Sequence, residues 1–357
     1  MHQFIATLNP HDATGTHALL LRDALRAAGW PSEIFAEAIH DDLAPEAFKH
    51  WMYPEHAAPG DVAIYQFTTS SAVAGYLDEL GIPLILDFHN FTGPEHFAGW
   101  EPGSVARATA AADELASLAP RALLGLAKSP FSEQALRRAG CRRTTVLPVL
   151  ADYGRVTATP DGRVAEELAR LRRDGGADFL FVGRIAPSKA QHELVKAVWA
   201  YRRLYDGEAR LHLVGGTSSY EYTKALQDFV HDLGLSAAVR LPGEVSEAAL
   251  AAYFAAADAY LSLSAHEGFG VPLVEAMVAG VPVVTRPAGA VSDTVADAAL
   301  VLADADPSYI AAALHRVCTD ERLRATLTAA GTRRAAALSR DLAARMVDAV
   351  AAVVGRP

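Results

Sequence analysis

The feature that most constrains this chain is a regular alternation of short apolar runs with amphipathic helical stretches from one end to the other. Such an alternation is typical of parallel sheets covered by helices. A first series of strands is predicted at Gln3–Leu8, Glu33–Phe35, Val62–Gln66, Leu84–Phe88, Ala122–Ala127 and Thr144–Leu147. A second series is predicted at Phe179–Val182, Leu211–Val214, Val239–Leu241, Ala259–Ser262, Val281–Thr285 and Leu300–Leu302.

Helical periodicity fills the intervals between these strands. Helices are predicted at Ala18–Ala28, Glu133–Ala139, His192–Tyr205, Glu221–Leu233, Glu247–Ala256, Val271–Ala279, Ser308–Thr319 and Asp341–Val354. The 357 residues suit two α/β domains of roughly 150–180 residues each. We therefore predict two Rossmann-like domains that face a central cleft: residues 1–150, an interdomain connection at 151–177, and residues 178–340. The final helix, within 341–357, is expected to pack back on the N-terminal domain.

Composition excludes several classes of function. A net charge of −10 argues against nucleic acid as a partner, because phosphate backbones need a basic surface. No apolar run approaches the roughly 20 residues that span a bilayer, and the N-terminus lacks the pattern of a signal peptide. Cys141 and Cys318 lie far apart without metal-like spacing. We therefore expect a protein of the reducing cytoplasm.

Two cationic side chains follow the strand predicted at Phe179–Val182. Gly183 permits a tight exit from the strand, and Arg184 and Lys189 lie five positions apart on the loop that follows. Ligands of such sheets bind beyond the carboxyl ends of the strands. A guanidinium offers a planar fork of donors and an ammonium a compact charge, so the pair could converge on one diphosphate. Two solvated surface cations are the alternative.

A glycine-rich turn follows the strand predicted at Ala259–Ser262 and leads into the next helix. Glu267 lies at the mouth of this turn, where it could accept hydrogen bonds from sugar hydroxyls, and Glu275 lies inside the helix, within reach of a ribose diol. The alternative makes Glu267 a partner of the helix dipole and Glu275 an ordinary surface residue. The amides at the start of the helix predict an anion pocket. They belong to Phe269, Gly270 and Val271.

These motifs resemble those of the family 4 glycosyltransferases, whose fold is called GT-B. Glu267 and Glu275, with seven residues between them, match the family's E-x7-E motif, and Gly183–Lys189 resembles its G-R-[LI]-x-P-x-K signature. Gly280–Val284 is similar to the G-x-P-V-[VI] strand that follows. The motifs occur in the family's order, and the likeness covers residues 178–319.

The resemblance implies a retaining transferase that moves a hexose-type sugar from a nucleoside-diphosphate donor. Arg184 and Lys189 would bind the donor pyrophosphate and stabilise the leaving group, Glu267 the sugar and Glu275 the ribose. The nucleotide base would lie against the strand-end loops that carry Gly215, Glu244 and Val245. The family implies no cofactor and no metal. The partners expected are a nucleotide sugar and a small-molecule, glycan or glycolipid acceptor, while peripheral contact with a membrane stays open.

In the first half, Asp87–Pro94 resembles the H-N-x-T-P stretch of a subset of these enzymes, with Gly93 inserted before Pro94. The family's catalytic-centre histidine maps to His89, with Asn90 supporting the loop. Many relatives carry a Gly-Gly pair in the first loop, where this chain has Gly15 alone. Side chains of this loop are reasonable contacts for the glycosyl acceptor, and exposed loop residues without a role are the alternative. They are His11, Asp12 and His17.

The sequence allows three alternatives to a metal-independent transferase. Asp304-Ala305-Asp306 has the form of a metal-binding D-x-D, but its place before Pro307 favours helix capping. A non-hydrolysing sugar-nucleotide epimerase shares the double-Rossmann architecture, and a non-catalytic nucleotide-sugar-binding protein is the third reading. The spaced pair Glu267 and Glu275, together with Arg184 and Lys189, favours transfer over epimerisation. His89 and Glu267 argue against a non-catalytic role.

Overall fold

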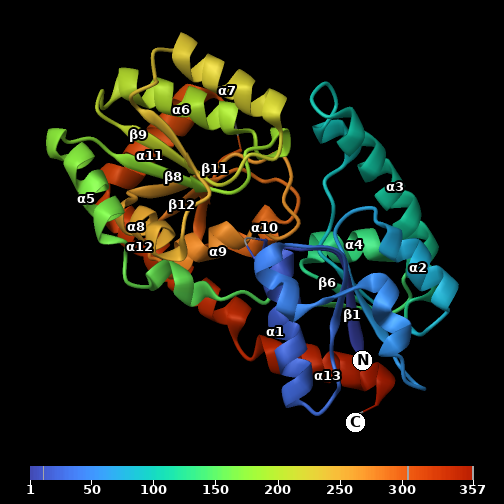
Figure 1. The fold of residues 1–357 in the computed structure, drawn as a ribbon. Helices are drawn as coiled ribbons and strands as arrows, with labels where there is room; N and C mark the ends of the chain where they lie inside the picture. The colour runs from blue at the N-terminus through green and yellow to red at the C-terminus, as the bar shows by residue number, and fades with distance from the viewer. Residues whose placement is uncertain (11, 304, 356–357) are drawn as a thin grey trace. The chain divides into compact units, whose positions relative to one another are not determined.

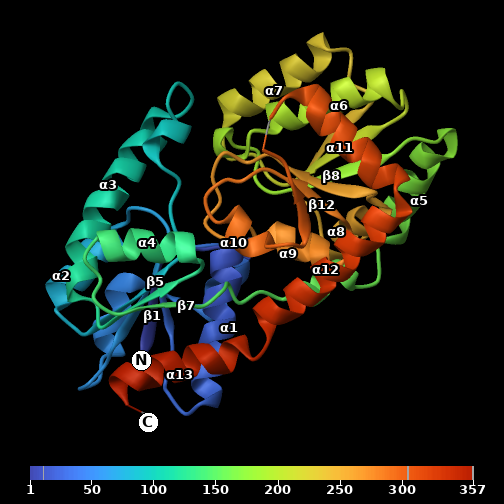
Figure 2. The same ribbon diagram turned by 180° about the vertical axis from the view of Figure 1, so that it is seen from behind.

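A computed structural model describes residues 1–10, 12–303 and 305–355, with Asp174 described by its backbone only. The chain divides into two compact units (Figures 1 and 2). Unit 1 comprises Met1–Glu95, Pro102–Asp152 and Leu338–Pro357, and unit 2 comprises His96–Glu101 and Tyr153–Ala337. Each unit is described by itself below.

Unit 1 is built on a seven-stranded parallel sheet with the order β3-β2-β1-β4-β5-β6-β7. Its strands are β1 (His2–Leu8), β2 (Ile34–Ile39), β3 (Phe48–Lys49), β4 (Ala63–Phe67), β5 (Leu84–Phe88), β6 (Leu124–Ala127) and β7 (Thr144–Val146). The strand order reverses between β1 and β4, as in a doubly wound Rossmann sheet. The crevice beyond the carboxyl ends of these strands is where such sheets bind ligands.

Helices cover both faces of the unit 1 sheet. They are α1 (Ala13–Ala27), α2 (Ala72–Leu80), α3 (Pro102–Leu118), α4 (Pro130–Arg138) and α13 (Leu342–Val354). On one face Leu21 of α1 and Met346 of α13 share a core with Ile64 and Ile85, and Figures 1 and 2 both show α13 beside α1. On the other face α2, α3 and α4 pack on the aromatic side chains of β1, β4 and β5. The last helix therefore belongs to the first unit.

Unit 2 repeats the same topology in a six-stranded sheet of order β10-β9-β8-β11-β12-β13. The strands are β8 (Asp178–Val182), β9 (Arg210–Val214), β10 (Val239–Gly243), β11 (Ala259–Ser262), β12 (Val283–Thr285) and β13 (Ala299–Val301). All neighbouring strands pair in parallel. The order reverses between β8 and β11, the two strands that precede the two predicted donor motifs.

The helices of unit 2 are α5 (Gly162–Leu171), α6 (Gln191–Leu204), α7 (Tyr220–Asp232), α8 (Glu247–Ala256), α9 (Val271–Val278), α10 (Val291–Val295), α11 (Pro307–Thr319) and α12 (Glu321–Ser339). Leu194 of α6, Leu226 of α7 and Ile310 of α11 share one core with the strands. The short 3-10 turns of the chain are η1 (Asp41–Glu46), η2 (His50–Glu55), η3 (Pro94–His96), η4 (Ala119–Arg121), η5 (Tyr153–Thr157), η6 (Arg172–Asp174) and η7 (Pro187–Lys189).

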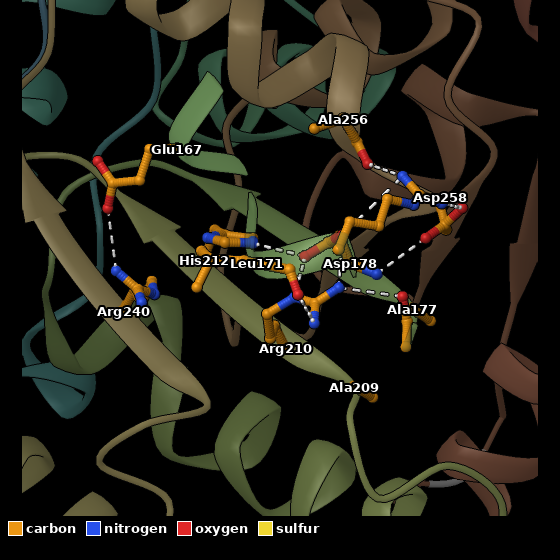
Figure 3. A network of polar contacts seen from close by, with 12 residues as sticks. Glu167, Leu171, Ala177, Asp178, Ala209, Arg210, His212, Arg240, Ala256 and Asp258 are labelled. Carbon is orange, nitrogen blue, oxygen red and sulfur yellow. Dashed lines mark hydrogen bonds and ion pairs between the residues drawn. The ribbon is translucent and has the colours of Figure 1, made fainter. Parts of the chain in front are cut away.

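A buried polar network fixes the amino ends of the unit 2 strands. Figure 3 shows Asp178, the first residue of β8, between Arg210 and His212 of β9. Arg210 donates from Nε to Asp178 Oδ1 over 2.7 Å and from Nη2 to Oδ2 over 3.0 Å. His212 Nε2 lies 2.9 Å from the same Oδ1. The remaining Arg210 donors reach backbone carbonyls, among them those of Leu171 and Gly176.

The α/β class and the two Rossmann-like sheets predicted from the pattern are confirmed. The predicted boundaries are wrong in several places. Helix α1 begins at Ala13, not at Ala18, so the expected first loop is mostly helical. Strand β3, with two residues, and helix α12, rich in alanine and arginine, were not predicted, because neither has a strong apolar period.

The segment 151–177, expected to be a connection, is folded into unit 2 from Tyr153 onward. Helix α5 begins with Asp161 as its N-cap, whose carboxylate accepts from Val164 N over 2.9 Å. The backbone of Asp161 also donates to Ala248 O at α8. Among the described residues, no helix is both long enough and apolar enough to cross a bilayer.

Candidate functional site

The two donor motifs meet at the point in unit 2 where the strand order reverses. The loop after β8 carries Lys189 in η7, and the loop after β11 carries Glu267. Because β8 and β11 are neighbours, the loops are joined by a backbone hydrogen bond from Ala265 N to Ser188 O over 2.8 Å. Lys189 Nζ donates to Glu267 Oε1 over 2.7 Å, and both side chains are partly exposed. A cation and a carboxylate therefore share one ligand-accessible edge.

Helix α9 begins beside Glu267, and its start suits an anion. Its N-cap, Gly270, has φ 86°, a conformation that side-chain-bearing residues rarely adopt, and supplies no side-chain cap. Within the described chain, the amides of Phe269, Gly270 and Val271 donate no hydrogen bond. Thr294 Oγ1 donates to Phe269 O over 2.6 Å and holds the turn in place. Such amides can bind a phosphate.

Arg184 and the predicted base-side residues lie along the same edge. The Arg184 side chain is exposed and makes no hydrogen bond or ion pair with the described residues, while its carbonyl accepts from Gln191 Nε2. Gly183 N donates to Val214 O and Gly215 N to Gly243 O, both over 2.9 Å, so the loops after β8, β9 and β10 are connected. Glu244 is exposed and Val245 is half-buried.

Glu275 differs from both expectations, because it is neither a surface residue nor free. Its side chain is fully buried in α9, and Oε1 accepts from Arg155 Nε over 2.7 Å. Arg155 Nη2 lies 2.6 Å from the same oxygen. Burial raises the pKa of Glu275, although Arg155 opposes the shift. Oε2 is buried and has no hydrogen-bond partner among the described residues.

Arg155 was missed by the sequence reasoning. It lies in η5, inside the segment expected to be a connection. No motif marked it, and its role becomes visible only when η5 packs against α9. Its signal was a lone arginine in a Gly- and Pro-rich segment, which is too weak to use.

In unit 1, three buried ionisable side chains meet at the carboxyl ends of the strands. Asp87 is the penultimate residue of β5, Lys128 directly follows β6, and His17 lies in α1. Lys128 Nζ pairs with Asp87 Oδ1, and His17 Nε2 lies 2.8 Å from Asp87 Oδ2. Burial acts to raise the pKa of Asp87, but Lys128 and His17 outweigh it and hold that pKa below its ordinary value. Burial, with help from Lys128, lowers the pKa of His17 to about 4.

His17 therefore has a structural role, and the expected contact with the glycosyl acceptor is withdrawn. Its side chain has no exposed surface, and its second ring nitrogen, Nδ1, accepts from Leu150 N over 2.8 Å. Asp12 is exposed at the N-cap of α1. Gly15 is needed for packing, because a Cβ there would lie 2.3 Å from Asn9 O. His11 lies outside the described residues.

His89 is half-buried directly after β5, and its backbone N donates to Phe67 O over 3.0 Å. Its Nε2 lies 2.7 Å from Gln66 Oε1. Asn90 adopts φ 71° and closes the turn by accepting from Phe91 N and donating to Ser132 Oγ. Asn90 thus supports the loop that carries His89.

The donor set of this cluster does not suit a metal ion. One ligand atom each from His17, Asp87 and His89 lie within 4.8 Å of one another. The Lys128 ammonium, however, already pairs with Asp87, and both ring nitrogens of His17 are engaged. Asp306 of the D-x-D sequence accepts from Ser308 N over 2.8 Å and caps α11, while Asp304 lies outside the described residues.

Comparison with known proteins agrees with this geometry. Residues 166–334 match the model of the family described as glycosyl transferases group 1. The chain is 31% identical over 275 residues to a D-inositol 3-phosphate glycosyltransferase of Thermobifida fusca, covering 73% of this chain and 62% of the relative. It is 36% identical over 194 residues to the enzyme of the same name from Frankia alni, covering 52% and 48%. The chain thus spans about half to three fifths of the curated relatives it matches.

The fold is shared with a solved structure over almost the whole length. Anabaena Alr3699/HepE, in complex with UDP and glucose, superposes with a TM-score of 0.75 at 20% identity and covers 98% of this chain and 99% of its own. That likeness extends over both units, whereas the family model covers the region of the donor motifs. The chain has the GT-B fold, and its residues 166–334 match the family of group 1 glycosyl transferases.

Proposed function

We propose that this protein transfers a hexose-type sugar from a nucleoside-diphosphate sugar to an acceptor, with retention of anomeric configuration and without a bound metal. The observation that carries the proposal is the pairing of Lys189 with Glu267 over 2.7 Å beside the start of α9. A pyrophosphate needs the cation and the amides, and the sugar attached to it needs a carboxylate nearby. Both requirements are met on one edge of the unit 2 sheet.

The chemistry follows from where charge develops. When the bond from the anomeric carbon to the phosphate oxygen breaks, negative charge accumulates on the leaving diphosphate. Lys189, Arg184 and the amides of Phe269–Val271 would stabilise that charge. Binding of the diphosphate would also draw Lys189 away from Glu267 and free that carboxylate for sugar hydroxyls.

The remaining residues receive roles on the same basis. Glu275 would accept a ribose hydroxyl at Oε2, and the loops of Gly215, Glu244 and Val245 would face the base. UDP-sugars are the first donors to test, since the HepE structure holds UDP and glucose. His89 and Asn90 are assigned to the reacting sugar on the resemblance of Asp87–Pro94 to the family. The glycosyl acceptor is a small molecule, a glycan or a glycolipid, and the free thiols Cys141 and Cys318 suit the cytoplasm.

The test measures release of nucleoside diphosphate from a panel of donors, with water as the default acceptor. Lys189→Ala is expected to lower the rate by about 100-fold or more, as for loss of a preorganised donor at a developing charge. The control is Lys196→Ala, which removes a partly exposed lysine of α6 that pairs with Glu193. An unchanged rate in Lys189→Ala would defeat the proposal.

The products separate transfer from the alternatives. An anomeric proton coupling in the product that matches the donor supports retention, and an inverted one contradicts it. Conversion of the donor into its epimer without loss of the nucleotide would instead identify an epimerase. Binding of donor without turnover, across a broad acceptor panel, would identify a nucleotide-sugar-binding protein.

A further inference from the structure

In the unit 1 cluster, the position of the ring proton on His17 and on His89 is set by a series of hydrogen bonds. Each series ends at a backbone group. For His17 the series is short. Leu150 N–H can only donate, so Nδ1 of His17 accepts over 2.8 Å. In a neutral ring the proton then sits on Nε2, which donates to Asp87 Oδ2 over 2.8 Å. Both nitrogens of His17 are therefore occupied.

For His89 the series is longer and runs through two buried glutamines. Gln3 Nε2 donates to the backbone carbonyl of Ala18 over 2.9 Å. Gln66 Nε2 donates to Gln3 Oε1 over 2.8 Å. Gln66 Oε1 lies 2.7 Å from His89 Nε2, so this oxygen accepts from the ring. The ring proton of His89 is therefore on Nε2.

The direction of this series cannot be reversed. The carbonyl of Ala18 only accepts, so the amide nitrogen of Gln3 must face it. If Gln66 were flipped, its nitrogen would face His89 and its oxygen would face Gln3 Oε1. Two acceptors would then oppose each other where the side chains of Gln3 and Gln66 are completely buried, and an unpaired buried polar group costs about 1–3 kcal/mol.

The sheet holds the relay in place. Gln66 on β4 lies opposite Ile5 on β1 and Asp87 on β5. Because alternate residues of a strand share a face, Gln3, Gln66 and Asp87 all point to the face covered by α1. The relay thus runs from the carboxyl edge, where His89 lies, inward to the helix. Its members lie on central strands and have little freedom to rearrange.

Burial, followed by the neighbouring Lys128 ammonium, lowers the pKa of His89 well below its ordinary value, although Asp87 opposes the shift. The ring is therefore neutral, and the tautomer decides what it offers. With the proton on Nε2, Nδ1 carries a lone pair that can accept a hydrogen bond. Nδ1 makes no hydrogen bond with the described residues. The other tautomer would present a donor in its place.

We propose that Gln3 and Gln66 are positioning residues that fix His89 as the Nε2–H tautomer, so that Nδ1 is kept ready to accept a hydrogen bond from a substrate hydroxyl. The identity of that hydroxyl, on the transferred sugar, rests on the proposed function. The tautomer itself does not, because the relay is complete without any ligand.

The first experiment reads the tautomer directly in the full-length protein without donor. Nitrogen chemical shifts of ¹⁵N-labelled histidine distinguish Nε2–H from Nδ1–H, and His89→Asn assigns the signal. Above neutral pH, wild type is expected to show His89 as Nε2–H. Gln3→Met is the decisive variant, because Gln3 does not touch His89. Without it the Gln66 amide can turn over and donate to Nε2, so His89 should become a mixture of tautomers.

Two controls distinguish a change in the tautomer of His89 from a general disturbance of the structure. The His17 signal is an internal control, since Leu150 sets its tautomer, and it should stay Nε2–H in every variant. Gln66→Met removes the oxygen that accepts from His89 Nε2, so His89 should lose its preference for the Nε2–H tautomer in that variant. A wild-type Nδ1–H tautomer, or an unchanged His89 signal in Gln3→Met and Gln66→Met, would overturn the proposal.

Turnover supplies the second readout. Gln3→Met is expected to lower kcat/KM for the donor by about fivefold to tenfold, the size of one hydrogen bond, and a donor deoxygenated at the contacted hydroxyl should abolish this difference. If no donor is turned over by wild type, the proposed function fails while the tautomer result stands by itself. If the tautomer shifts but kcat/KM does not, Nδ1 accepts no hydroxyl and the proposed use of the relay is wrong.

Discussion

The two units each bury a polar network with a histidine and a carboxylate, yet the networks differ in where they lie and in what they leave open. In unit 2, Asp178, Arg210 and His212 occupy the amino ends of the strands (Figure 3). In unit 1, His17 and Asp87 occupy the carboxyl ends, with His89 beside them. Parallel sheets bind ligands at the carboxyl ends only.

The Nδ1 atoms of His212 and His89 show the same difference between the two units. Nδ1 of His212 also lacks a partner, but it is fully buried, and its ring faces Tyr253 at a centroid distance of 5.5 Å. His89 is half-buried on the ligand edge. The lone pair of His212 lies at the amino ends of the strands and indicates no site, whereas that of His89 lies at the carboxyl edge. The network of unit 2 stabilises the fold, and we propose that the network of unit 1 also prepares His89 for binding.

The largest expected effects come from removing one cation from each network. Lys128→Met leaves the Asp87 carboxylate buried without its ammonium, and Arg210→Met does the same to Asp178. Loss of one partner of a buried pair typically costs about 3–5 kcal/mol. Hydrogen exchange of the strand amides should show the loss in unit 1 for the first variant and in unit 2 for the second.

Turnover should separate these two variants. At a temperature where both remain folded, Lys128→Met should lower donor turnover, because Asp87 and His17 border His89. Arg210→Met should keep the wild-type rate. A clear loss of turnover in folded Arg210→Met would break the distinction between a structural network and a functional one. Adding Asp87→Leu to Lys128→Met should restore part of the stability, because it removes the buried carboxylate that has lost its ammonium partner.

A smaller effect is expected from pH. The pKa of His17 is lowered to about 4 in the folded protein from 6.5, so between these values the unfolded chain binds the additional proton. Stability contributed by the neutral ring is therefore complete above pH 6.5 and is lost as the pH falls toward 4. The loss amounts to at most about 3 kcal/mol. Denaturant titrations across this range should show it for unit 1.

The variant His17→Gln checks the cause. It keeps a donor toward Asp87 but cannot bind the proton, so its stability should depend less on pH over the same range. The residual slope should come from His2 and His89, the other histidines of unit 1 whose pKa is lowered, chiefly by burial. An identical slope in wild type and His17→Gln would show that another group controls acid stability.

Sequence reasoning succeeded where a local pattern carries the information. The period of apolar residues predicted both sheets. The motifs at Gly183–Lys189 and Glu267–Glu275 marked the two loops that the hydrogen bond from Lys189 to Glu267 joins. No local sequence pattern predicts the order of the strands, which places β8 beside β11. This order follows from packing, and it explains why Lys189 and Glu267 meet.

The errors have the same origin. His17 was predicted to lie in the first loop, whereas α1 begins at Ala13 and includes it. Gly15 packs so closely that a Cβ there would lie 2.3 Å from Asn9 O. Glu275 was expected to be accessible because its helix position was known but its burial was not. Gln3 and Gln66 read as ordinary polar residues in strands. Only the neighbouring strands reveal that they are linked to each other and to His89.

The smallest expected effect concerns the pair of Arg155 and Glu275. In Glu275 only one carboxylate oxygen has a hydrogen-bond partner, whereas in Asp178 both have one. Arg155 engages Oε1 only, and the proposed function assigns a ribose hydroxyl to Oε2. Arg155→Met should therefore weaken donor binding by about tenfold, which corresponds to about 1.4 kcal/mol, with kcat little changed. Isothermal titration with UDP and the KM for the donor measure this effect.

The reason for a modest effect is that Arg155 is itself partly exposed, with 26% of its side chain accessible, so water can enter when it is removed. Without the guanidinium the pKa of Glu275 should rise further, because burial already raises it. More of the carboxyl is then protonated at lower pH, and a protonated carboxyl accepts a ribose hydroxyl less well. UDP affinity of Arg155→Met should therefore fall more steeply with decreasing pH than that of wild type. Arg155→Met combined with Glu275→Gln removes the titrating group and should abolish this difference, whereas a pH dependence that persists in the double variant would place the ribose elsewhere.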